Sequence, residues 1–157
     1  MRQWLAFSVC CLVLSAAIAT DTAPVRAQSL TAEGEKPGYR VEVVSLKRED
    51  GGTVTLTFRL HNDTDRRADF ACELRENGSE GCRQVSGVHL IDGANRKKHL
   101  VVRDSTGACV RSTTLTSVAP KGSVNLWAKF PAPLENAQKV TVIVPQFLPV
   151  DNVPIGR

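Results

Sequence analysis

From Tyr39 onward, apolar and polar residues alternate with a period of two, and this alternation restricts the fold more than any other feature. It is clearest over residues 53–61, where threonines, Arg59 and His61 occupy every second position. Such alternation is typical of a β-strand with one buried face. We therefore predict a strand at Thr53–His61, with a buried face made of Val54, Leu56, Phe58 and Leu60.

Six further segments carry the same signal, and turn-forming residues separate them. No stretch shows a helical period. About seven short strands predict an all-β domain, most simply an immunoglobulin-like sandwich of antiparallel strands; a small barrel is the alternative. The pair of core cysteines around a buried tryptophan, typical of true immunoglobulin domains, is absent. The six additional predicted strands are Tyr39–Lys47, Asp69–Leu74, Val88–Ile91, Lys98–Arg103, Ser123–Phe130 and Lys139–Val144.

Three local signals refine this prediction. The adjacent apolar residues Val43 and Val44 break the alternation, which a β-bulge would explain. Residues 49–52 end in two glycines and predict a hairpin turn. Prolines punctuate the C-terminal tail, so we expect the tail to lie extended along a sheet edge.

The N-terminus has the pattern of a secretory signal peptide. Arg2 precedes an apolar run from Leu5 to Ala19, which ends in an A-x-A cleavage signal at residues 17–19, and a second candidate lies at residues 25–27. We assign residues 1–27 to a signal peptide, with earlier cleavage after Ala19 as the alternative. The run is shorter than the roughly 20 apolar residues that span a bilayer. We therefore expect export to the periplasm, cell envelope or exterior, and no transmembrane segment in the mature protein.

The remaining chain has the size and composition of one soluble domain. Residues 28–38 are small and polar and predict a flexible lead-in, so we place the domain at residues 39–157. The formal charge is only +4, and aromatic residues make up 5% of the chain. A charge this small and so few aromatic side chains argue against a nucleic-acid partner.

Three cysteines remain after the leader: Cys72, Cys82 and Cys109. In an oxidising compartment two of them should pair. Cys72 and Cys82 flank a polar stretch that reads as a loop closed at its base, so we predict this disulfide, with Cys82–Cys109 as the alternative. Cys109 would then be either a reactive thiol or a buried small side chain.

No catalytic signature is present, and we predict a protein that is not an enzyme and has no cofactor or metal ligands. The alternative is a small secreted enzyme or redox protein that uses Cys109. Asn62, Asp63 and Asp65 could instead belong to a calcium-binding module, or simply form an Asx-type turn. The three histidines, His61, His89 and His99, lack zinc-site spacing.

Trp127 is the candidate binding residue. Alternation places it opposite the core face of its strand, and an outward tryptophan is a favoured interface anchor. The alternative is that the tail folds over it through Phe147, Leu148 and Val150. The resulting hypothesis is a non-enzymatic binding or structural module with an envelope or secreted partner.

Four short motifs also resemble a known family. The motifs are Val88–Asp92, Arg103-Asp104-Ser105 with Gly107 and Cys109, Phe130–Pro133, and Val153–Ile155. With them, the chain from Tyr39 onward is similar to uncharacterised immunoglobulin-like domains of exported bacterial proteins, some of which stand before an OmpA-type domain. The resemblance implies the sandwich fold and a location in the cell envelope, and it implies no catalytic residues. Relatives often carry a second cysteine two residues after the position of Cys109, where this chain has Arg111.

Overall fold

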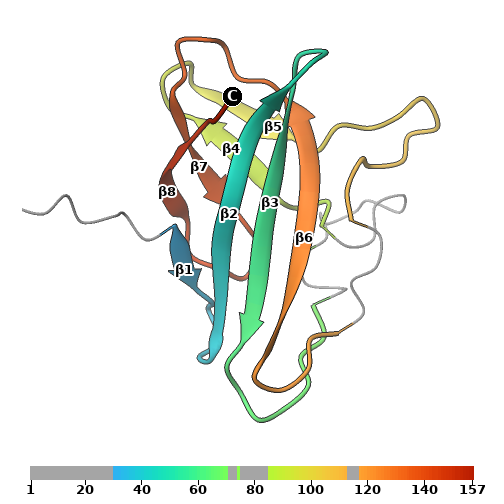
Figure 1. The fold of residues 1–157 in the computed structure, drawn as a ribbon, viewed down its shortest axis with the longest axis vertical. Coiled ribbons are helices and arrows are strands. Elements are labelled where there is room, and N and C mark those ends of the chain that lie inside the picture. The colour runs from blue at the N-terminus through green and yellow to red at the C-terminus, as the bar shows by residue number, and fades with distance from the viewer. Residues whose placement is uncertain (1–29, 71–73, 75–84, 113–116) are drawn as a thin grey trace, which may run out of the picture.

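The structure, a computed structural model, describes residues 30–70, 74, 85–112 and 117–157. These residues contain eight β-strands and no helix (Figure 1). The first sheet has the order β1-β2-β3-β6 and the second has the order β5-β4-β7-β8. The strands are β1 (Thr31–Glu33), β2 (Tyr39–Glu49), β3 (Thr53–Asn62), β4 (His89–Asp92), β5 (Lys97–Leu100), β6 (Gly122–Pro131), β7 (Lys139–Ile143) and β8 (Val150–Pro154).

The two sheets pack as a β-sandwich around one apolar core, which confirms the predicted all-β class (Figure 1). Every pairing between named strands is antiparallel. The predicted apolar face of β3 is buried along its whole length, and it meets the inward side chains of β4 and β7. Burial of alternate residues on long strands is what fixes the register, because a slip of one residue would expose the whole set. The largest fully buried side chains are Phe58, Phe130, Leu56, Leu60, Leu74 and Leu90.

The predicted irregularity in β2 is confirmed. Val43 pairs with Phe58, but Ser45 pairs with the next residue of β3, Thr57, so Val44 is the extra residue of a bulge. The side chain of Val44 is exposed as a result. The hairpin at residues 49–52 is also present, and Gly51 and Gly52 have φ values of 85° and 75° that suit glycine.

The predicted strand Asp69–Leu74 does not form within the described residues. Ala68 makes only an isolated bridge to Val118, and the N–H of Leu74 donates to the carbonyl of Phe70. Phe70 and Leu74 are both buried in the core. Residues 71–73 of the predicted strand lie outside the described residues.

The expected lead-in at residues 28–38 contains strand β1. Ala32 is buried opposite Val41, so the paired part of the sandwich begins before Tyr39. The C-terminal tail lies extended along a sheet edge as predicted, and residues 150–154 also pair with β7 as β8. Nothing in the described part of the chain forms a helix long and apolar enough to cross a membrane.

The chain passes from the second sheet to the first after β5. The N–H of Val102 donates to the carbonyl of Lys129, and the N–H of Lys129 donates to the carbonyl of Val110. A short hairpin over residues 102–112 therefore lies along the outer edge of β6. Its turn lies at Asp104, where the N–H of Gly107 donates to the Asp104 carbonyl at 3.0 Å.

Candidate functional site

Trp127 lies on the outward side of β6, as the alternation predicted. Its neighbours Leu126 and Ala128 are buried, whereas 40% of Trp127 is exposed. Its backbone is held on both sides: it pairs with Thr57 of β3, and its N–H donates to Ser112 Oγ at 2.8 Å. The carbonyl of Trp127 in turn accepts from the N–H of Ser112. The indole therefore stands on a well-fixed backbone.

The tail does not cover Trp127, which overturns that alternative. Phe147 is buried and stacks against Phe70, with ring centroids 6.0 Å apart. Val150 belongs to β8, at the edge of the other sheet. Leu148 is itself exposed, and its N–H donates to the carbonyl of Glu33.

A row of linked polar side chains crosses the sheet next to Trp127. Glu42, Arg59 and Asn125 lie opposite one another on β2, β3 and β6. Arg59 Nε donates to Asn125 Oδ1 at 2.8 Å, and Arg59 Nη1 lies 3.5 Å from Glu42 Oε2. The same Glu42 oxygen lies 2.9 Å from His61 Nε2. The carboxylate therefore joins two basic groups of β3.

On the other side of Trp127 lies a second polar row. Lys47, Thr55 and Lys129 occupy corresponding positions on the three strands. Lys129 Nζ lies 2.6 Å from the Glu49 carboxylate. This contact is the largest influence that holds the pKa of Glu49 below its ordinary value. We call Trp127 and these two rows the Trp127 face.

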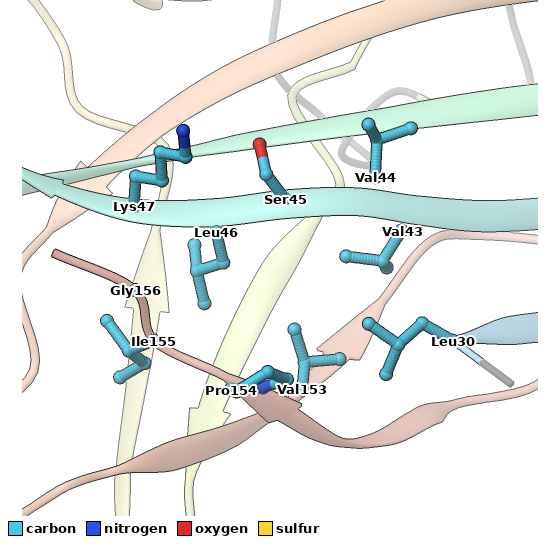
Figure 2. A pocket seen from close by; sticks show the side chains of 10 residues that line it. All are labelled: Leu30, Val43, Val44, Ser45, Leu46, Lys47, Val153, Pro154, Ile155 and Gly156. Atoms are coloured by element: carbon cyan, nitrogen blue, oxygen red, sulfur yellow. The ribbon is translucent and has the colours of Figure 1, made fainter. Parts of the chain in front are cut away.

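A second feature is an apolar opening of about 220 Å³ on the side of the sandwich, between β2 and β8. In Figure 2 the side chains of Val43 and Leu46 point toward Val153 and Ile155, whereas Ser45 and Lys47 point to the opposite side of β2. Leu30 stands at one end of the opening and Gly156 at the other. We call this opening the side socket.

Hydrogen bonds to β2 close one end of the side socket. There Gly156 donates to the carbonyl of Leu46 and accepts from the N–H of Arg48, at 2.8 and 2.9 Å. An apolar cavity of roughly 150 Å³ holds a benzene molecule. The side socket therefore has room for one ring or one branched apolar side chain.

Cys109 is disulfide-bonded, and its partner lies outside the described residues. This overturns the expectation of a free thiol at Cys109. Cys72 and Cys82 also lie outside the described residues, and so does their predicted disulfide. Cys109 is partly buried against the core and pairs with Arg103 in the hairpin beside β6.

The acidic cluster after β3 has the geometry of a turn. Asn62 Oδ1 accepts from both the N–H and the hydroxyl of Thr64, as in an Asx-type turn. Asp63 faces Arg40 at 3.0 Å, and Asp65 faces Lys121 at 3.3 Å. The two carboxylates thus have separate cationic neighbours, and no group of three metal-ligating side chains gathers among the described residues.

The three histidines do not form a common site: His61 lies on the first sheet, whereas His89 and His99 lie on the adjacent strands β4 and β5 of the second. His61 is bound to Glu42 on the first sheet. His89 Nδ1 lies 3.0 Å from the carbonyl oxygen of Gly87, and His99 is buried with Nε2 4.0 Å from the Asp92 carboxylate. Asp92 is itself engaged, because its carboxylate accepts from the backbone and the side chain of Asn95. None of these histidines lies on the same element as Trp127.

Comparison of the chain with protein-family models, with curated proteins and with solved structures finds no match. The chemistry of the Trp127 face and of the side socket must therefore be argued from their own residues.

Proposed function

We propose that the protein is an exported, non-enzymatic binding module of the cell envelope, with an immunoglobulin-like sandwich that presents the Trp127 face to a partner. The observation that carries this proposal is the exposure of Trp127 on a regular sheet face. Large aromatic side chains are enriched among residues that dominate binding energy. Tryptophan suits this role because it adds a large contact area and a polar N–H at a low entropic cost.

Two features support the proposal that the protein is exported. The N-terminal pattern is that of a signal peptide, and Cys109 is disulfide-bonded. Disulfides form and persist mainly in oxidising compartments such as the periplasm and the exterior.

The disulfide at Cys109 supports a non-enzymatic role. A thiol nucleophile must be free and ionised, whereas Cys109 is already bonded.

Affinity capture from envelope extract tests the proposal. Wild type, Trp127→Ala and Leu148→Ala are immobilised at equal density, and bound components are compared by quantitative mass spectrometry. Leu148 is a matched control because it is exposed but lies beside Glu33, at the β1 end of the sandwich. The proposal predicts a component that wild type and Leu148→Ala retain and Trp127→Ala loses. Equal capture by all three proteins would contradict it.

Intrinsic fluorescence provides a direct second readout. The sequence contains two tryptophans, Trp4 and Trp127, so a chain that starts at Thr20 reports on Trp127 alone. Binding at the Trp127 face should shift its emission to shorter wavelength and protect it from iodide quenching. A captured component that leaves both signals unchanged would bind elsewhere.

A further inference from the structure

We propose that the ligand of the Trp127 face is a neutral saccharide, with one sugar ring stacked on the indole of Trp127. This inference rests on the proposed function and specifies the ligand class of that site. It follows from the chemistry of the side chains around the indole and from their fixed arrangement.

Trp127 is the largest apolar side chain on this side of the sheet. The other outward residues of β3 and β6 are threonines, a serine, an asparagine, Arg59, His61, Lys129 and, at the end of β6, Pro131. On β2, Val44 is exposed and points to the same side as Ser45 and Lys47 (Figure 2). A protein–protein interface normally has an apolar core of several side chains and buries about 800 Å² on each partner. Trp127 and Val44 lie two strands apart and make too small an apolar core for such an interface. The indole matches a sugar ring, whose C–H face is apolar and whose rim carries hydroxyl groups, and an aromatic face attracts such C–H groups.

The polar row Glu42–Arg59–Asn125 is arranged before any ligand binds. Asn125 Oδ1 is held by Arg59, which leaves the two N–H donors of the same amide directed away from that bond. Glu42 uses Oε2 for His61 and Arg59, so Oε1 remains as an acceptor. A row that offers both donors and acceptors suits hydroxyl groups, which both donate and accept. Because the side chains are already ordered, binding costs less conformational entropy.

The spacing of the rows also fits a disc-shaped ligand. Asn125 and Lys129 each lie two residues from Trp127 along β6, which places them about 7 Å away on either side. A ring stacked on Trp127 would therefore bring its rim hydroxyls toward Asn125 on one side and Lys129 on the other. The backbone bonds from Ser112 keep the stacking platform in place.

Charge favours an uncharged ligand over a polyanion. The two rows contain Arg59, Lys47 and Lys129, and these are balanced in part by Glu42 and Glu49. Glu42 contacts Arg59, and Glu49 contacts Lys129. A phosphate or polyanionic chain would have to compete with these carboxylates, whereas a neutral sugar can bind to the pairs as they stand.

The test is a fluorescence titration of the chain that starts at Thr20. The probes are the β-1,4-linked tetrasaccharides of glucose and of N-acetylglucosamine, and the α-1,4-linked tetrasaccharide of glucose. We expect at least one probe to give a saturable blue shift of Trp127 emission and protection from iodide. Asn125→Ala should weaken that affinity about five- to tenfold, as expected for a lost hydrogen bond. Ser123→Ala, two residues further along β6, is the control and should bind like wild type.

Failure of this inference can be told apart from failure of the proposed function. If none of the three probes changes the emission up to about 10 mM, a limit beyond which binding is negligible, the saccharide inference is overturned. A protein captured in a Trp127-dependent manner would then leave the binding module intact with a different partner class. Binding of a probe with equal affinity to wild type and Asn125→Ala would overturn the role of the polar row. Circular dichroism and urea unfolding of each variant confirm that the fold is retained.

Discussion

The buried side-chain amide of Asn62 donates a hydrogen bond of 3.0 Å to the carbonyl oxygen of Ala119. The same nitrogen donates to the carbonyls of Arg66 and Val118 at 2.7 and 3.2 Å. Asn62 is fully buried at the end of β3, and it ties the loop after β3 to the start of β6. Its amide nitrogen, not a ligand oxygen, faces this cluster of carbonyls. The residue that the sequence offered as a calcium ligand therefore has a structural role.

Asn62→Ala should reduce the free energy of unfolding by about 2 kcal/mol, because it leaves buried carbonyls without a donor. Urea unfolding followed by circular dichroism measures the change. Asn136→Ala is the control: Asn136 is exposed and bonds only to the side chain of Asn95, so its loss should cost less than about 0.5 kcal/mol. Equal midpoints for the two variants would argue against the role assigned to Asn62.

The turn at Asp104 leads to a pH prediction. The Thr106 hydroxyl and the N–H groups of Thr106 and Ala108 donate to the carboxylate, and they hold the pKa of Asp104 below its ordinary value. A lowered folded-state pKa means that the ionised carboxylate stabilises the hairpin near neutral pH. That contribution is lost as the pH falls through the folded-state pKa.

Thr106→Val removes the strongest of these donors and should raise the pKa of Asp104 toward its ordinary value. The measurement is an NMR titration of the Asp104 side-chain carboxyl carbon in wild type and variant. Ser105→Ala is the neighbouring control and should leave the titration unchanged. A Thr106→Val titration that coincides with wild type would show that the hydroxyl has little influence.

Local alternation predicted the long strands because each buries one face. It was least informative where other constraints decide the structure. In β1 only Ala32 is buried, so three residues carry no visible period. In β8 the prolines concealed a strand that pairs at a sheet edge, where a missing N–H is tolerated. Phe70 and Leu74 are buried in the core although neither belongs to a named strand.

The sequence likewise predicted one part of the candidate sites and could not predict the rest. The outward direction of Trp127 follows from the parity of β6 alone. The polar row beside it depends on the register of three strands, and the bulge at Val44 shifts that register by one residue. The side socket combines Leu30, residues 43–47 and residues 153–156, which are far apart in the sequence. No local signal could have brought those segments together.

The disulfide of Cys109 gives a third prediction. In a chain without its leader, Cys72 and Cys82 are the remaining partners, so one of them should be linked to Cys109 and the other should be a free thiol. Peptide mapping after alkylation without reduction identifies both. Closing the loop between Cys109 and either of these cysteines stabilises the protein by at most about 4 kcal/mol in the chain-entropy model. Reduction should therefore lower the unfolding midpoint. A Cys72–Cys82 bond together with an alkylated Cys109 would contradict this prediction.

The last prediction concerns the frame of the side socket. A chain that ends at Ile155 loses the two backbone hydrogen bonds between Gly156 and β2, at Leu46 and Arg48. Each such bond contributes about 1 kcal/mol, so the free energy of unfolding should fall by about 2 kcal/mol. Amide exchange at Arg48 should also accelerate, because its N–H loses its acceptor. The control is a chain that ends at Gly156, which lacks only the exposed Arg157 and should match wild type in both measurements. If the two shortened chains behave alike, the Gly156 bonds do not close this end of the side socket.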